Sequence, residues 1–242
     1  MFDCFPKEGL LKPIFENAQQ PRISPEVLDG KLVAGWRHFG TRFFRCNFAI
    51  HEGRLCGVLP LRIRVGDFEM SKSQRRIWRG GAEFDTKVLP AIVTDEHHDL
   101  FERHKARFSD NVPDSLFDFI DPAPARIPCE TRCVEIRTAD GGLVAVSFFD
   151  VGADSLSSVY AMFDAAFADS SPGILTILHE LATARELGKR YHYLGYSYTI
   201  PSPYDYKRRF ASLEAYEWNS GWKPFPRGLE WSRELDEPRR AV

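Results

Sequence analysis

The sequence predicts a mixed α/β fold of the α+β class, and three features of its second half support that prediction. Residues 143–149 and 157–163 are short runs rich in Val, Phe and Tyr between turn-forming residues, which predicts the two strands of a hairpin. Between residues 174 and 187 apolar side chains recur every three or four positions, as on one face of a helix. Residues 191–198 follow as a strand that we expect to lie parallel to the strand before the helix. Together these segments form a β-β-α-β unit.

Both ends of the helix in this unit carry residues that favour helix termini. Ser171 is a good N-cap, and Pro172 suits the first helical position because its fixed φ angle is already helical. Gly188, at the other end, can adopt the left-handed conformation that closes a helix. We expect this helix to pack on the sheet through three leucines, Leu175, Leu178 and Leu181.

The first 65 residues predict one helix and two strands. Ser24 is an N-cap followed by Pro and an acid, so a helix is expected over residues 25–35. Strands are expected over residues 41–50 and 59–65, with a turn at residues 51–53 between them. Alternation in the second strand places apolar residues on one face and arginines on the other: Leu61, Ile63 and Val65 against Arg62 and Arg64.

Residues 71–79 predict a helix, capped by Ser71 or Ser73, with an unusual run of positive charge. The helical spacing stacks four cations on one face, which we call the cation stripe: Lys72, Arg75, Arg76 and Arg79. Like charges at this spacing repel, so such a stripe faces either solvent or an anion. The spacing alone leaves both open, a solvated helix face or a phosphate-binding surface.

Residues 94–119 predict a helix, a break at a proline and a second short helix. Three histidines in this segment lack the spacing of a catalytic zinc motif, and we expect exposed side chains: His97, His98 and His104. The Pro-rich residues 121–130 are expected to be an extended linker. The chain would then consist of an N-terminal lobe (residues 1–120) and a C-terminal domain (residues 131–242).

Bulk properties exclude several classes of protein. A hydrophobic content of 43% and a charged content of 27% are typical of a globular chain, and the net charge of −2 excludes a generally basic nucleic-acid coat. No apolar run is long enough to span a bilayer and no signal-peptide pattern is present, so a cytoplasmic protein without membrane contact is expected. The odd cysteine count favours reduced thiols without a bound metal: Cys4, Cys46, Cys56, Cys129 and Cys133.

Short motifs give the β-β-α-β unit a more specific meaning. The unit contains SSVY at residues 157–160, then Phe163-Asp164, an S-x-G that opens the helix, and YLGY at residues 193–196, and a Tyr-Lys pair follows at 206–207. Upstream lie GWRHFGTRFFR at residues 35–45 and SKSQRRI at residues 71–77. In this order the motifs resemble those of the arginyl-tRNA protein transferases and their bacterial leucyl relatives, the aspartate/glutamate transferases. The β-β-α-β unit is similar to the core of the GNAT acyltransferase fold.

The resemblance implies an enzyme that transfers an amino acid, arginine or leucine, from aminoacyl-tRNA to the N-terminal α-amine of a protein. It favours the phosphate-binding interpretation of the cation stripe, because SKSQRR is one of the shared motifs. The tRNA contacts it implies are Lys72, Ser73, Gln74, Arg75, Arg76, Arg79 and Lys207. The family's clustered cysteines are only partly kept, since Leu55 stands beside Cys56 where a second cysteine is expected, so neither a metal nor an iron–sulfur cluster is expected.

Aminoacyl transfer needs positioning more than strong acid–base catalysis, because the ester on tRNA is already activated. Two carboxylates, Asp150 and Asp164, are candidates to bind the amine or accept its proton. Ser158, Tyr160 and Tyr196 are hydroxyl candidates for oxyanion contact or proton relay, and all five are expected around one crevice. Acidic acceptor N-termini are implied by the family, and two arginines are candidates to bind them, Arg208 and Arg209.

Two alternatives remain at this stage. An acyl-CoA-dependent N-acetyltransferase on the same fold usually needs a glycine-rich helix start, whereas here only Gly173 follows Pro172. A non-catalytic relative that binds tRNA or protein N-termini is the second, because the cysteine pattern is altered and the turn before Tyr206 differs from the family's.

Overall fold

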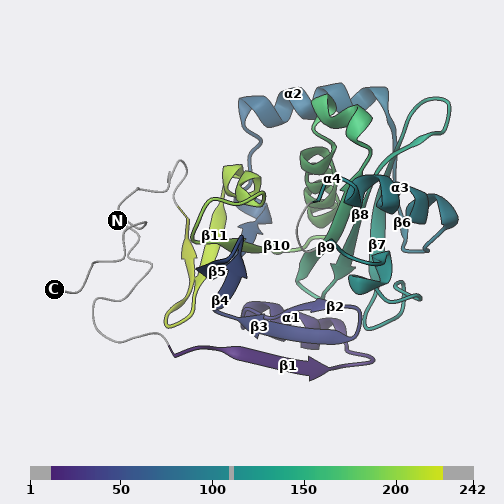
Figure 1. The fold of residues 1–242 in the computed structure, drawn as a ribbon. Coiled ribbons are helices and arrows are strands. Elements are labelled where there is room, and N and C mark those ends of the chain that lie inside the picture. The colour runs from purple at the N-terminus through teal and green to yellow at the C-terminus, as the bar shows by residue number, and fades with distance from the viewer. Residues whose placement is uncertain (1–11, 109–111, 226–242) are drawn as a thin grey trace.

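The computed structural model describes residues 12–108 and 112–225, and the expectation on Cys4 lies outside these ranges. Two sheets are formed in this part of the chain (Figure 1). The small sheet has the strand order β1-β3-β2, from β1 (Phe15–Gln19), β2 (Arg37–Phe39) and β3 (Arg42–Cys46). The large sheet has nine strands in the order β12-β11-β5-β10-β9-β8-β7-β6, with β4 paired to β5. Its strands are β4 (Phe48–His51), β5 (Arg54–Arg64), β6 (Asp85–Pro90), β7 (Thr131–Arg137), β8 (Leu143–Val151), β9 (Ser155–Phe163), β10 (Tyr191–Tyr198), β11 (Leu213–Glu217) and β12 (Gly221–Pro224).

The predicted β-β-α-β unit is confirmed. Strands β8 and β9 form the antiparallel hairpin, and β10 lies parallel to β9. Helix α4 (Pro172–Glu186) connects β9 to β10. Its three expected core leucines are buried: Leu175, Leu178 and Leu181. Ser171 occupies the N-cap position, but it has φ 54° and makes no side-chain cap hydrogen bond, so its expected capping role is wrong.

The two expected halves share one sheet. Strands β5 and β6 come from the first half, where β5 pairs with β10 and β11, and β6 pairs with β7. Residues 121–130 form turns rather than an extended linker, and Pro124 and Pro128 are buried in them. The expected boundary therefore crosses a continuous set of backbone hydrogen bonds.

The large sheet is covered on both faces. One face packs against α4 through a core that includes Phe149, Leu156 and Leu178, and α2 (Lys72–Gly80) packs on α4 from outside, with the Trp78 and His179 rings 4.5 Å apart. The other face carries α3 (Asp95–Lys105), α1 (Pro25–Val33) and the small sheet (Figure 1). None of the helices in the described part of the chain is long and apolar enough to cross a membrane.

In the first half of the chain, the predicted helices, strands and turns agree with the structure better than the predicted solvent exposure of the side chains does. The helix expected at residues 25–35 and the turn at residues 51–53 are both present, the turn with positive φ at Glu52 and Gly53. The strand expected over residues 41–50 is divided into β3 and β4 at the buried Asn47. Two of the three histidines expected to be exposed are buried, because each has a specific partner: His97 bonds to Glu135 and His104 to the backbone of Phe163.

We expect Leu178→Ala to lower the free energy of unfolding by ~2–5 kcal/mol, because the change leaves a cavity between α4 and the sheet. Leu178 is fully buried in the core cluster. Leu187→Ala is a matched control, since that side chain is 40% exposed at the end of α4. Urea denaturation measures both variants, and a loss below about 1 kcal/mol at Leu178 would contradict its place in the core.

Candidate active site

Strands β9 and β10 pair over only three residues and then separate, and we call this point the fork. Their parallel register runs from Tyr191 opposite Ser155 to Tyr193 opposite Ser157. Beyond it β9 continues beside β8 and β10 beside β5, and each of these pairings is interrupted by a register shift next to the fork. Such bulges bend strands and change where side chains point. The fork is therefore built by backbone irregularities in both strands.

Arg37, from β2, enters the fork. Its Nη2 donates to the carbonyl oxygen of Val159 at 2.6 Å. Its Nη1 lies against Gly195, where an added Cβ would overlap the guanidinium, and Gly195 has φ +80°, which favours glycine. The third residue of YLGY must therefore be glycine for Arg37 to reach this position. Burial lowers the pKa of Arg37, which nearby Tyr196, Tyr204 and Asp150 partly offset.

Lys207 is a second buried cation at the fork. Its Nζ donates to the carbonyl oxygen of Tyr196 at 3.1 Å, and burial together with the charge of Arg37 holds its pKa well below the ordinary value. No carboxylate lies within 4.0 Å of Arg37 or Lys207 among the described residues, and Arg37 Nη1 is buried without a hydrogen-bond partner there. Two buried basic side chains thus lie at the fork, and Arg37 has an incomplete set of acceptors among the described residues.

Two of the predicted hydroxyls lie on the face of the sheet away from α4. Tyr160 stacks on Phe119 with ring centroids 4.0 Å apart, and its hydroxyl is buried without a partner among the described residues. Tyr196 donates to the carbonyl oxygen of Gly35 at 2.9 Å. Burial raises the pKa of both phenols, so both are protonated donors at neutral pH. Of the two hydroxyls, that of Tyr160 is the one without a partner among the described residues.

Ser158 lies on the opposite, α4-facing side and belongs to a buried triangle. Its Oγ donates to Glu180 Oε2 at 2.5 Å and lies 3.0 Å from His192 Nε2. His192 Nε2 is 2.8 Å from the same Oε2 of Glu180. The glutamate and the histidine are buried, whereas Ser158 is half-buried. The serine is therefore the member of the triangle that another molecule can approach.

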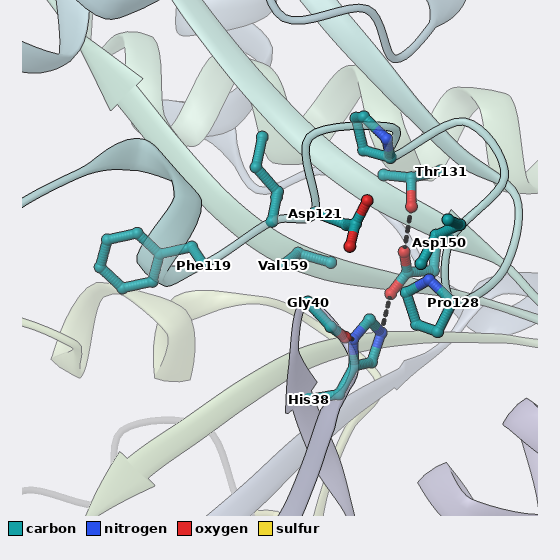
Figure 2. Close-up of a pocket in the computed structure, with 11 residues that line it drawn as sticks. His38, Gly40, Phe119, Asp121, Pro128, Thr131, Asp150 and Val159 are labelled. Atoms are coloured by element: carbon teal, nitrogen blue, oxygen red, sulfur yellow. Dashed lines mark hydrogen bonds and ion pairs between the residues drawn. The ribbon is translucent and has the colours of Figure 1, made fainter. Parts of the chain in front are cut away.

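Asp150 is buried beside a small cavity on the face away from α4 (Figure 2). Its Oδ2 is 2.7 Å from His38 Nε2, and its Oδ1 accepts from the Thr131 hydroxyl at 2.7 Å. His38 Nδ1 lies 2.8 Å from the carbonyl oxygen of Gly40. Both oxygens of Asp150 are engaged inside the protein, so its main role is to hold β2, and with it Arg37, against β8.

The described residues contain one group with the composition of a metal site: His38, Cys129 and Asp150, whose ligand atoms lie within 4.8 Å of one another. Burial and the nearby Asp150 carboxylate raise the pKa of the Cys129 thiol, so the sulfur retains its proton. His38 and Asp150 are already bonded to each other. A metal ion at this group would have to displace the proton on Cys129 and the proton shared by His38 and Asp150.

The remaining candidate residues lie outside the fork or are already engaged. Asp164 forms an ion pair with Arg103 at 3.0 Å and caps the turn after β9. Arg208 bonds to Ser197 Oγ and to the carbonyl oxygen of Tyr198, and Arg209 is exposed. Lys207, next to the expected acceptor-binding arginines, is the basic residue of this segment that is buried at the fork.

The five residues expected around one crevice are thus divided between two faces of the sheet. Ser158 and Tyr160 are two residues apart and would share a face in a regular strand, but the register shift at Val159 places them on opposite faces. Three fork residues were not predicted: Arg37, Glu180 and His192. Arg37 lies within GWRHFGTRFFR, and an acid inside the apolar face of a helix was the signal for Glu180.

The cation stripe is on the surface of α2. All four of its side chains and Ser73 are exposed, and Ser71 caps the helix in a reciprocal capping box with Gln74. Gln74 is buried by that role, and Lys207 is buried at the fork, so neither side chain lies on the stripe. The surface available for phosphates is therefore Lys72, Ser73, Arg75, Arg76 and Arg79.

If the cation stripe binds phosphates, replacing both Arg75 and Arg76 by Ala lowers the slope of log affinity for tRNA against log salt by roughly one to two units, because fewer counterions are released. The double variant Arg22→Ala/Arg126→Ala is a charge-matched control, since both arginines are exposed elsewhere on the surface. A salt titration of tRNA binding compares the two. Equal slopes would return the stripe to a solvated helix face.

Comparison with known proteins agrees with this geometry. The family model described as "Arginine-tRNA-protein transferase, C terminus" matches residues 95–217. The aspartate/glutamate leucyltransferase of Gluconacetobacter diazotrophicus is 33% identical over 190 residues, which cover 76% of this chain and 73% of that protein. The protein of the same name from Chromobacterium violaceum is 29% identical over 222 residues, covering 86% of this chain and 87% of that one. The solved structure of L-PGS from Bacillus licheniformis shares the fold, with a TM-score of 0.50 at 13% identity over 66% of this chain and 60% of that one.

Parallel strands that separate beside a connecting helix define a GNAT-like fold, in agreement with the prediction. The chain belongs to the arginine-tRNA-protein transferase family, as the motifs had indicated. It transfers an amino acid from aminoacyl-tRNA to protein N-termini. The acyl-CoA-dependent and non-catalytic alternatives are therefore set aside.

Proposed function

We propose that the amino acid transferred is leucine and that the acceptors are proteins with an N-terminal aspartate or glutamate. The relatives that cover most of the chain carry the name aspartate/glutamate leucyltransferase. The observation in the structure that supports the acidic acceptor is the pair of buried cations at the fork, Arg37 and Lys207. The acceptor carboxylate would bind between them.

The physical argument rests on charge. Burial disfavours the charged form of both groups and lowers their pKa values, so a bound anion would stabilise that form, and neither group has a carboxylate partner among the described residues. A side-chain carboxylate would supply the missing charge, and Arg37 Nη1 would gain its hydrogen-bond acceptor. An N-terminal Asn or Gln has the same shape but no charge. The site would therefore reject the amides.

In the proposed reaction the acceptor α-amine attacks the ester carbonyl of the aminoacyl-tRNA at the fork. Holding amine and ester together can supply ~7 kcal/mol or more of barrier lowering. The buried phenol of Tyr160 is the donor we assign to the developing oxyanion. The ester provides the driving force, so the proposal requires no cofactor.

The donor would bind through its phosphates on the cation stripe, with its aminoacyl end at the fork. Helix α2 carries the stripe and packs directly on α4, whose Glu180 faces the fork. The helix that carries the stripe is thus packed directly on the helix that carries a fork residue. Because charged tRNA is the donor, we place the reaction in the cytoplasm.

The test is incubation with charged total tRNA and five peptides that differ only in residue one: Asp, Glu, Asn, Gln and Lys. Mass analysis reads the added residue directly. We expect the mass of one leucine on the Asp and Glu peptides and less than about 1% as much on their amides, since leaving buried charges unpaired costs several kcal/mol. Arginine addition, or equal extension of Asp and Asn peptides, would overturn the proposal.

A further inference from the structure

The Ser158–Glu180–His192 triangle is not required to explain the fold or the binding of the acceptor carboxylate. It is buried between β9, α4 and β10, where Glu180 bonds to both of its partners. We propose that Ser158 and Glu180 form the path that removes a proton from the attacking amine. The proposal rests on the fork as the reaction site, and it holds whichever amino acid or acceptor residue is used.

The heavy-atom distances favour one arrangement of the protons. Both Ser158 Oγ and His192 Nε2 face the same oxygen of Glu180, at 2.5 and 2.8 Å. A carboxylate oxygen accepts two donors readily, so the serine hydroxyl and the His192 Nε2–H both point to Oε2. Because Nε2 carries a proton, His192 cannot act as the base for Ser158. The triangle is thus not a serine–histidine–acid relay, because the Ser158 hydroxyl bonds to Glu180, and the other ring nitrogen of His192, Nδ1, is buried without a partner among the described residues.

Ser158 is the residue of the triangle that a bound substrate can reach. Glu180 is 1% exposed and His192 is 0% exposed, whereas Ser158 is half-buried at the first residue beyond the paired part of the fork. Glu180 is close enough to affect the pKa of two fork residues, Lys207 and Tyr206, which it raises relative to their burial alone. The charged and titratable groups facing Glu180 are therefore His192 from β10 and Lys207 and Tyr206 from the turn after it.

The proton balance of the step is complete. The acceptor ammonium passes one proton to Ser158 Oγ, which passes its own proton to Glu180 Oε2, and the neutral nitrogen forms the new C–N bond. The ester C–O bond then breaks. One proton ends on the leaving ribose oxygen of tRNA and one is released to solvent, so no other reactant is needed. Ser158 touches the amine, and Glu180 acts through Ser158.

Glu180→Gln keeps the volume and an acceptor oxygen but cannot take up a proton. We expect its kcat/KM for the peptide to fall 10²–10⁴-fold at pH 7, the usual range for a lost general base, with unchanged tRNA affinity. The defect should shrink as pH rises past about 8, because the α-amine then arrives already neutral. Ser158→Ala should show the same pattern, and the double variant should be no worse than either single one.

Glu186→Gln is the matched control, an exposed glutamate six residues further along α4, and it should behave as the wild type. Single-turnover transfer from pH 6 to 9.5, with whichever tRNA and peptide the wild-type enzyme uses, separates this test from the proposed substrate preference. A defect that stays constant across pH, or losses that add in the double variant, would overturn the relay and leave Glu180 as a structural group. If Glu180→Gln unfolds in a thermal melt, Ser158→Ala carries the same comparison.

Discussion

Gly195→Ala should abolish most transfer activity, by at least about 100-fold, because it displaces Arg37 from the fork. An added Cβ would overlap the Arg37 guanidinium, whose Nη2 is bonded to Val159. A misplacement of about 1 Å in a positioning group can cost 10²-fold in rate. The positive φ of +80° adds a backbone cost of about 1–2 kcal/mol for any residue other than glycine.

Gly188→Ala separates the cost of a positive φ angle from the effect of displacing Arg37. Gly188 also has a positive φ, of +67°, but no atom lies within 4 Å of its added Cβ. We expect Gly188→Ala to lose only the backbone contribution to stability in denaturation and to keep its transfer activity. Combining Gly195→Ala with Arg37→Ala should reduce the loss of stability to that backbone contribution without restoring activity, since the overlap is gone but so is the guanidinium. Wild-type transfer by Gly195→Ala would show that Arg37 is not needed at this position.

Lys207→Met should change stability and activity in opposite directions. The amine of Lys207 is buried without a carboxylate partner among the described residues, and burial holds its pKa well below the ordinary value. An apolar side chain of similar length should therefore leave the free energy of unfolding equal or higher by about 1 kcal/mol. Transfer to Asp and Glu peptides should lose one charge-assisted hydrogen bond, ~1.5–3 kcal/mol, or ten- to 150-fold in kcat/KM.

Arg209→Met provides the control, because Arg209 lies two residues further along the same turn and is exposed. Peptide titrations and urea denaturation of both variants give the comparison. A Lys207 variant that is strongly destabilised, with transfer reduced no more than its folded fraction, would assign the lysine to structure. Equal losses for Asp and Asn peptides would also remove it from acceptor recognition.

The sequence was most informative where structure is local. The hairpin, α4, β10 and the capped helix α2 were all predicted within a few residues, because each depends on periodicity and on capping residues next to the element. The prediction that His97 and His104 are exposed was wrong, since the burial of each depends on a partner more than 35 residues away, Glu135 and the Phe163 backbone. A single sequence without its contacts does not reveal such pairings.

The sequence by itself determined the class of fold, the family and the surface cation stripe. Only the tertiary structure decided the chemistry of the fork. Arg37 meets Gly195 across more than 150 residues, and the register shift at Val159 turns Ser158 toward Glu180 and Tyr160 away from it. The reason is physical. Local patterns set the period of a strand, but one inserted residue reverses the face of the sheet on which every later side chain lies. The role of a buried charged group then depends on the side chains that this face contacts.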